Sequence, residues 1–472
     1  MGATPLVIEL ARRKGWVDQP NARSVHNKPI ARLGGIAIFF ATMLATLPVL
    51  AIQNAVGDQF RDILPQVLVL LGAASLMFVA GMYDDIKGLR ARTKLLVQLI
   101  AAIAVCASGT HINGITVQGL FSIDFGFYGC LITVLWIVGV TNAVNIIDGL
   151  DGLAAGISAI ACGVMAVMAV HGGNVVLAIL MLALLGSLTG FLCFNFNPAR
   201  IFMGDCGSLF IGFVIASASV MTAAKSQALV GIAMPILVLG IPIFDTLFSM
   251  LRRFLQRRGV MSADRSHFHH RLLDLGFSQH QVAIIAYVIT LMIAGMGFFL
   301  LATRSASSII VFLSCLLILL LIFRVIGSVR LRETLAGIRK RKQLAVDQSE
   351  ERRQFEEAQL YFRDAREFNT WWQAVCLAAD KLQIIQLVLF LTNRDGVSRQ
   401  MAWQSANVFD PANCVNMEVP IPGRRQNEQL LMDVKIAKNG SLESVGRRIS
   451  LLTRLMEEHG LDSLLVPPIE PL

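Results

Sequence analysis

The apolar sequence GVTNAVNIIDGLDGLAAG, residues 139–156, is interrupted by two asparagines, Asn142 and Asn145, and two aspartates, Asp148 and Asp151. The first three are spaced three residues apart, so on a helix they share one side and form a polar stripe. Gly149 and Gly152 break that helix and free Asp151 to turn back toward the same side. The alternative for Asp151 is that it caps a helix beginning near Leu153. Polar residues at membrane depth are typical of a functional site, so we expect one here.

A second motif, FNFNPARIFMGDCGSLFIG, places Asp205 in a Gly-Asp-x-Gly-Ser turn before an apolar run that begins at Ser208. The amides of a helix N-terminus would then face the same layer as the carboxylate, which suits a metal-bound phosphate; simple helix capping is the alternative. A third motif, MYDDIKGLRARTK, sets Asp84 and Asp85 ahead of four basic residues. These paired carboxylates are candidates for the same functional site, and the alternative is that they form a solvated turn.

The fourth motif, SADRSHFHHRLLDLGFS, contains three histidines and two arginines, Arg265, His267, His269, His270 and Arg271. A zinc site is a poor interpretation, because nearby cations oppose a dication. Arginine and histidine donors bind phosphate oxygens directly. Acids suited to Mg²⁺ beside cations suited to phosphates together predict metal-dependent phosphoryl transfer at a membrane surface.

The composition of the chain indicates the elements that must position these motifs. Of 472 residues, 55% are hydrophobic and 15% are charged, and the mean hydropathy is +0.63. Because about 20 apolar residues span a bilayer core as a helix, we predict an all-α polytopic membrane protein with about ten to eleven transmembrane helices. The ten apolar segments are 33–52, 66–82, 94–108, 127–146, 153–170, 174–194, 208–224, 229–251, 281–303 and 308–326, and TPLVIEL before Arg12 is interpreted as the stub of an eleventh.

Basic residues gather in alternate connections between these segments, which sets the predicted orientation. By the positive-inside rule, these connections and the tail after Arg324 are cytoplasmic, and all four motifs fall on the cytoplasmic side. The opposite connections include residues 110–126, where we expect a short periplasmic hairpin. Topology explains the net charge of +9, so we expect no nucleic-acid partner. The eight cysteines form no C-x-x-C pair, so we also expect no disulfide framework and no zinc ribbon.

In chain order, VDQPNARSVHNKPIARLGG, DD, NAVNIIDGLDG, FMGDCGS and ADRSHFHHR resemble the polyprenyl-phosphate N-acetylhexosamine-1-phosphate transferases, most closely the bacterial branch that uses UDP-N-acetylglucosamine. The resemblance implies transfer of N-acetylhexosamine 1-phosphate, with N-acetylglucosamine as the expected sugar, from a UDP-sugar to undecaprenyl phosphate, with release of UMP. It implies a multi-pass protein of the bacterial inner membrane that initiates a cell-surface polysaccharide such as lipopolysaccharide O-antigen.

The same resemblance implies roles for individual residues. It implies that Asp205 and Asn145 bind Mg²⁺, with Mn²⁺ as the alternative, and that Phe202 stacks on uracil. It makes Asp84, Asp85, Asp148 and Asp151 the catalytic acids, of which the first two position the acceptor phosphate and the others line the nucleotide pocket. The remaining substrate contacts fall to Arg265, His267, His269 and His270, and, in the first loop, to His26, Lys28 and Arg32. The role of Asp245 stays open.

Three regions are expected. Residues 1–329 form the membrane-embedded transferase domain, residues 330–366 a helical linker of mixed charge, and residues 367–472 a small cytoplasmic α+β domain with four strands and a final helix over 442–459. That domain either senses a ligand or partner or is a passive stabiliser, and a homodimer also stays open. Two other functions are weighed: a phospho-N-acetylmuramoyl-pentapeptide transferase, which has three consecutive histidines, and a membrane transporter, which would carry its acids near the bilayer midplane.

Overall fold

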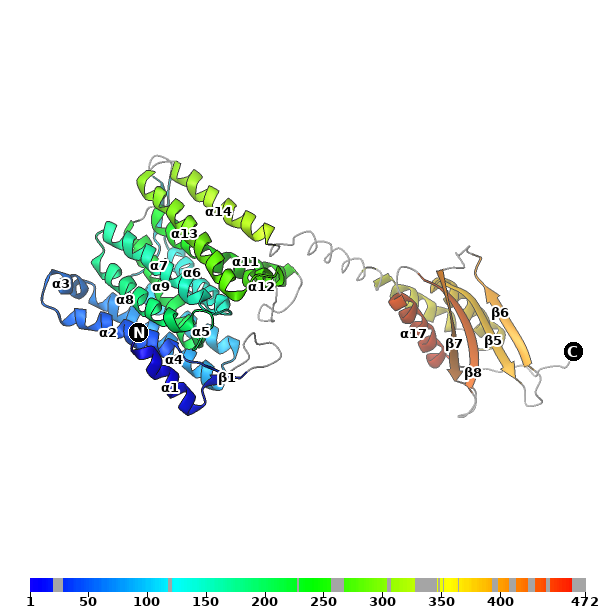
Figure 1. Ribbon diagram of the computed structural model, residues 1–472. Coiled ribbons are helices and arrows are strands. Elements are labelled where there is room, and N and C mark those ends of the chain that lie inside the picture. The colour runs from blue at the N-terminus through cyan, green and yellow to red at the C-terminus, as the bar shows by residue number, and fades with distance from the viewer. Residues whose placement is uncertain are drawn as a thin grey trace. The chain divides into compact units, whose positions relative to one another are not determined.

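The computed structural model describes residues 1–19, 29–117, 121–226, 229–255, 267–303, 307–326, 346, 349–350, 352–363, 365–392, 398–406, 413–422, 429–438 and 442–460. The chain divides into two compact units, Met1–Thr334 and Leu335–Leu472. Figure 1 shows that the first unit is a bundle of helices and that the second contains a sheet. Each unit has its own apolar core.

The N-terminal unit consists of helices and two short hairpins. Its helices are α1 (Ala3–Lys14), α2 (Gly35–Thr46), α3 (Ala55–Asp62), α4 (Leu64–Lys87), α5 (Ala91–Ala107), α6 (Tyr128–Ile147), α7 (Leu153–His171), α8 (Val175–Asn195), α9 (Gly204–Ser226), α10 (Leu229–Val238), α11 (Gly240–Leu255), α12 (Phe268–Asp274), α13 (Gln279–Thr303) and α14 (Ser307–Val325). A 3-10 turn, Leu47–Ala51, follows α2. The hairpins pair β1 (Val17–Asp18) with β2 (Ile30–Ala31), and β3 (Gly114–Val117) with β4 (Phe121–Asp124).

Several of these helices have the dimensions of membrane spans. Within the described residues, six helices are long and apolar enough to cross a bilayer, or eight if each of two bent pairs is one span. The protein is therefore a multi-pass membrane protein, and the total of ten to eleven helices stays a prediction. The segment expected at 229–251 is not one straight helix: α10 and α11 meet at a bend of 75°. Pro242 has no N–H to donate to Val238, where α10 ends.

Helix α9 lies at the centre of the unit and carries the second motif at its start. Its membrane-spanning window is 94% buried, and it packs against α2, α4, α6, α7, α8 and α10. Glycines permit the closest approaches: a Cβ on Gly35 would lie 2.2 Å from the Gly207 nitrogen. The stacked rings of Phe39 and Phe78, 4.1 Å apart, fill the neighbouring space. The site motif is thus fixed to a rigid, fully packed element.

The end of α5 and the start of α6 are joined by a disulfide, contrary to the expectation from the sequence that there is no disulfide framework. Cys106 and Cys130 form a disulfide, with their Cα atoms 5.9 Å apart. The two cysteines are 24 residues apart in the sequence, so they do not form a C-x-x-C motif. The β3–β4 hairpin between them brings the end of α5 and the start of α6 together in space. The hairpin itself is confirmed.

The C-terminal unit is a four-stranded antiparallel sheet in the order β6-β5-β8-β7 with helices packed on it (Figure 1). Its elements are α16 (Phe368–Lys381), β5 (Ile384–Thr392), β6 (Ser398–Gln404), β7 (Cys414–Pro422), β8 (Gln429–Ala437) and α17 (Leu442–Glu458). The four strands and the final helix are confirmed, while α16 was not foreseen. Residues 352–362 are also helical and add Phe355, Ala358 and Phe362 to the core of this unit. The predicted domain limits stay a prediction.

Candidate functional site

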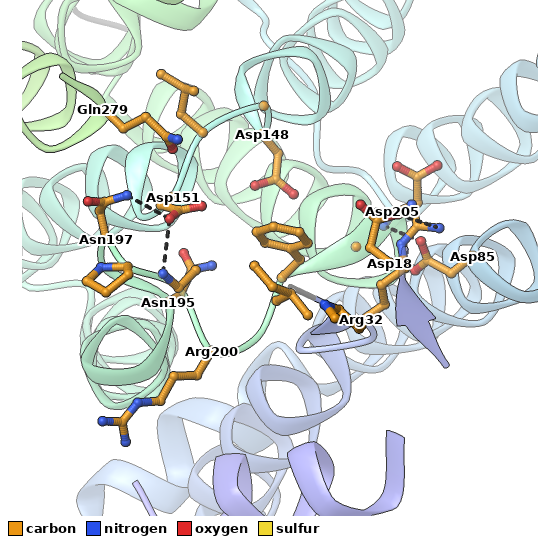
Figure 2. A pocket seen from close by; sticks show the side chains of 18 of the residues that line it. Asp18, Arg32, Asp85, Asp148, Asp151, Asn195, Asn197, Arg200, Asp205 and Gln279 are labelled. Carbon is orange, nitrogen blue, oxygen red and sulfur yellow. Dashed lines mark hydrogen bonds and ion pairs between the residues drawn. The ribbon is translucent and has the colours of Figure 1, made fainter. Parts of the chain in front are cut away.

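The predicted motifs converge on one cavity of about 840 Å³ in the N-terminal unit. Eight predicted site residues line it: Arg32, Asp84, Asp85, Asp148, Asp151, Phe202, Asp205 and His270. Asn145, His267 and His269 are described but are not among its lining residues, and His26, Lys28 and Arg265 lie outside the described residues. In Figure 2, Asp85 and Asp205 lie on one side of the cavity, Asp151 and Asn197 on the other, and Asp148 between them.

A lysine that the sequence analysis did not assign to the site joins two of the acids. Lys94 of α5 forms ion pairs with Asp84 at the end of α4 and with Asp205 at the start of α9, the latter at 2.6 Å. Asp84 also accepts a hydrogen bond of 2.6 Å from the Leu89 amide. These contacts contradict the solvated-turn alternative for the adjacent aspartates. They tie α4, α5 and α9 together at the cavity.

Asp85 caps α9 from outside that helix. Its two carboxylate oxygens accept from the amides of Asp205, at 3.0 Å, and Cys206, at 2.9 Å. The carboxylate satisfies two amides that a helix start otherwise leaves without partners and complements the helix dipole. A Cβ on Gly204, where φ is +73°, would lie 2.6 Å from the Asp85 carboxylate. Asp205 is therefore not the capping residue, and its own carboxylate is available to the cavity and to Lys94.

Asp148 ends α6 as its C-cap residue and is half-buried in the cavity wall. Burial, together with the negative charges of Asp205 and Asp85, raises the pKa of Asp148 to about 8. A carboxylate is penalised when it loses water and when other carboxylates face it. A cation bound beside these carboxylates would favour the ionised form of Asp148.

Asp151 holds the loop that precedes the α9 motif. One carboxylate oxygen accepts from the Asn197 side chain, at 2.9 Å, and from the Ala199 amide, at 3.0 Å. The N-cap residue of α7 is Gly152, so the capping alternative for Asp151 is wrong. Asn195 completes the junction, because it accepts from the Gly152 amide and donates to the Ile201 carbonyl. As expected, glycine at 152 has a positive φ, +76°, and lets the chain turn back.

Phe202 is held in the cavity wall by backbone pairing with the first loop. Its amide donates to the Ala31 carbonyl at 2.8 Å, and its carbonyl accepts from the Gly34 amide at 2.9 Å. Arg32, between those partners, lies 3.7 Å from Asp18, and both line the cavity. The first loop and the α9 motif, 170 residues apart in the sequence, thus form one wall.

The histidine motif packs against the turn that follows Asp148. His270 lines the cavity, whereas His269 packs behind it, its Nε2 3.0 Å from where a Cβ on Gly149 would be. Burial lowers the pKa of His269 to about 4, so this ring is neutral at physiological pH. Among the described residues, no group of three His, Cys, Asp or Glu side chains has the arrangement of a metal site.

The cavity also includes residues that sequence reasoning missed. Besides Lys94, which neighbours it, these are Arg12, Asp18, Asn195, Asn197, Arg200 and Gln279. Arg12 and Arg200 are among the basic residues of the connections predicted to be cytoplasmic, and Gln279 begins α13 beyond the histidine motif. A cytoplasmic position shared with the motifs was the only sequence signal available for the two arginines.

The donor chemistry of the cavity fits a hard divalent cation. Six carboxylates line it, those of Asp18, Asp84, Asp85, Asp148, Asp151 and Asp205, and carboxylate oxygens are the ligands that Mg²⁺ and Mn²⁺ prefer. Asp205, the predicted metal ligand, and Asp148 both line the cavity, and the negative charge of Asp205 acts on Asp148. Asn145, in the last turn of α6, stays a predicted ligand.

The sequence resembles known enzymes. A model described as glycosyl transferase family 4 matches residues 67–223. A probable undecaprenyl-phosphate N-acetylglucosaminyl 1-phosphate transferase of Bacillus subtilis (strain 168) is 38% identical over 61% of this chain and 77% of its own. A decaprenyl-phosphate N-acetylglucosaminephosphotransferase of Mycobacterium tuberculosis (strain ATCC 25618 / H37Rv) is 35% identical over 61% and 76%. A phospho-N-acetylmuramoyl-pentapeptide-transferase of Desulforudis audaxviator (strain MP104C) is 31% identical over 62% and 92%.

Proposed function

Because this chain belongs to the polyprenyl-phosphate N-acetylhexosamine-1-phosphate transferase family, we propose that it transfers N-acetylglucosamine 1-phosphate from UDP-N-acetylglucosamine to undecaprenyl phosphate and releases UMP. The observation that carries the proposal is the convergence of five predicted acids and the Phe202 ring on one cavity in a membrane protein, with Lys94 paired to two of those acids. We further propose the bacterial inner membrane as its location, with the cavity on the cytoplasmic side, and initiation of a surface polysaccharide as its role.

The residues of the cavity suit positioning and electrostatics better than strong base catalysis. Both oxygens of Asp85 already accept from α9 amides, and Asp84 is paired with Lys94. An acceptor phosphate is largely anionic at neutral pH, so its attack needs orientation rather than deprotonation. In the proposed mechanism, Asp85 fixes the start of α9 and Asp84 fixes Lys94. Phe202 stacks on the uracil.

A bound Mg²⁺ would supply positive charge that stabilises the diphosphate as the pyrophosphate bond is exchanged. Asp205 and Asp148 would hold it, with Asn145 the further candidate. His270 and Arg32, in the cavity wall, would donate to phosphate or sugar oxygens.

The related pentapeptide transferase activity is the second candidate, because a protein of that name matches over 92% of its length. The sequence His267-Phe268-His269-His270 argues against it, since three consecutive histidines are the expected pattern there.

The test is turnover by the purified protein with undecaprenyl phosphate and a panel of donors: UDP-N-acetylglucosamine, UDP-N-acetylgalactosamine and UDP-N-acetylmuramoyl-pentapeptide. We expect a lipid-linked product with UDP-N-acetylglucosamine, at a rate at least about tenfold above the other donors. Omission of undecaprenyl phosphate is the control. Turnover with the pentapeptide donor alone would favour the second candidate, and turnover with none of them would refute the proposal.

A further inference from the structure

Asp245 is a buried carboxylate behind the histidine motif, and the proposed reaction assigns it no role. It lies on α11 with 3% of its surface exposed. One oxygen accepts from the Phe268 amide at 2.7 Å, and the other lies 3.1 Å from Nδ1 of His267. A buried carboxylate is costly unless it is paired, and both of these partners belong to the histidine motif. Asp245 therefore anchors the start of α12 to α11.

The contact with His267 fixes the proton on that ring. An ionised carboxylate can only accept hydrogen bonds, so Nδ1 must carry a hydrogen. In the neutral ring, Nε2 is then the acceptor. The side chain of Asp245 sets the tautomer of His267 as well as its orientation.

From His267 a row of rings leads to the cavity. The rings of His267 and His269 are parallel, with centroids 5.8 Å apart, and the rings of His269 and His270 are 4.4 Å apart. His269 packs against Gly149, next to Asp148, and His270 lines the cavity. A displacement of His267 would therefore reach the wall where the proposed substrates bind.

We propose that Asp245 is a positioning residue of the transferase site, which acts through His267 and the Phe268 amide to hold His270 toward the cavity. The expected loss of transfer rate rests on the proposed function, whereas the anchoring of α12 to α11 does not. A carboxylate that orients a functional histidine typically contributes 10- to 100-fold, on the order seen for partners of metal-ligating histidines.

Two substitutions separate the two contacts of Asp245. Asp245→Asn keeps an oxygen for the Phe268 amide but turns an amide NH₂ toward Nδ1, which conflicts with the proton there. Asp245→Ala removes both contacts. Thr246→Val is the matched control, because Thr246 is the next residue on α11, is buried, and its hydroxyl has no hydrogen-bond partner in the described part of the chain.

The first measurement is amide hydrogen exchange over residues 267–275 of the full-length protein, which needs no substrate. We expect Asp245→Ala to speed exchange there, and Asp245→Asn and Thr246→Val to leave it near wild type. Unchanged exchange in Asp245→Ala would overturn the anchoring role, even if the protein proved to have another activity.

The second measurement is a double-mutant cycle on the transfer rate with His267→Asn. We expect Asp245→Asn to lower the rate about 10- to 100-fold, and to lower it little further when His267 is already Asn. A wild-type rate in Asp245→Asn, or losses that multiply in the double variant, would overturn the proposed action through His267. Absence of transfer in the wild type would instead refute the proposed function and leave the exchange result to decide on the anchor.

Discussion

The Asp205 carboxylate lies in the first turn of α9, ion-paired with Lys94 and facing the cavity. Asp205→Asn keeps the size of the side chain but removes the charge that would bind a cation. We expect turnover to fall by about 100-fold or more while the protein stays folded in the membrane, and Asn145→Ala to lower it sharply as well. Asp58→Asn, at an exposed carboxylate on α3, is the control. Activity within about twofold of wild type in Asp205→Asn would exclude the metal assignment.

The raised pKa of Asp148 predicts how stability depends on pH. Between the ordinary pKa of an aspartate, about 4, and the folded value of about 8, the folded state binds more protons than the unfolded state. Stability contributed by the protonated group is therefore present at low pH and is lost as the pH rises toward 8. In metal-free protein we expect the wild type to lose melting temperature from pH 6 to 8 relative to Asp148→Asn.

Thermal melting at several pH values checks this, and Mg²⁺ provides the second arm. A bound cation favours the ionised carboxylate, so Mg²⁺ should narrow the gap between wild type and Asp148→Asn at pH 8. Parallel melting curves for the two proteins at every pH would show that Asp148 is not held protonated by its surroundings.

At the level of single residues, acids were easier to predict from the sequence than their partners. Asp148 and Asp205 stand out because carboxylates are rare in apolar runs. Lys94 does not stand out, since lysines near the end of a membrane helix are ordinary, and its role arises only when α4 packs against both α5 and α9. Asp151 was predicted at the site, but its contacts with Asn197 and Ala199 depend on how a distant loop folds.

At the level of elements, the junction of α4 with α9 requires glycine at one position. A Cβ on Gly81 would lie 2.4 Å from the Asp205 carbonyl oxygen, which belongs to the backbone and cannot move aside. We expect Gly81→Ala to force α9 away from α4, and so to lower both stability and transfer activity. Gly72→Ala, on the same helix with nothing within 4 Å, is the matched control and should be neutral or stabilising by about 0.5–1 kcal/mol.

Melting temperature and transfer rate, measured on both glycine variants, test that expectation. Equal behaviour of Gly81→Ala and Gly72→Ala would mean that the spacing between α4 and α9 does not govern the site.

The elements were predictable where apolar runs were long and regular, and less so where tertiary contacts decide. The α6 helix and its end before Gly149 follow from the sequence alone. The bend between α10 and α11 and the helix α16 do not. Gly240 and Pro242 lie inside an apolar run that hydropathy reads as continuous, and the apolar face of α16 is recognisable only once β5 lies beneath it.

At the level of the whole molecule, the disulfide and the site lie at opposite ends of the same helices. Cys130 is near the start of α6 and Asp148 is at its end, which is about 27 Å along a helix. Disulfides persist in oxidising compartments, and basic connections face the cytoplasm. Both signals favour the proposed orientation, with the site on the cytoplasmic side.

Reporter fusions test this orientation. We expect fusions after Arg258 or at Leu472 to report a cytoplasmic location, and an insertion near Gly119, between β3 and β4, to report a periplasmic one. A thiol-alkylation assay on intact cells should find Cys106 and Cys130 oxidised. Cleavage of the C-terminal unit by a protease added from the periplasmic side would show that the orientation is the reverse of the proposed one.

The bond that breaks distinguishes the proposed reaction from that of an ordinary glycosyltransferase with the same donor. In the proposed reaction an oxygen of the acceptor phosphate bonds to the phosphorus that carries the sugar, and the bridging oxygen leaves with UMP. A glycosyltransferase would instead break the sugar–phosphate bond and leave UDP. Phosphorus label placed next to the sugar should therefore enter the lipid, and added UMP should drive the reaction backward, because one pyrophosphate bond is exchanged for another of similar energy. Release of UDP with the label left in water would refute sugar-1-phosphate transfer.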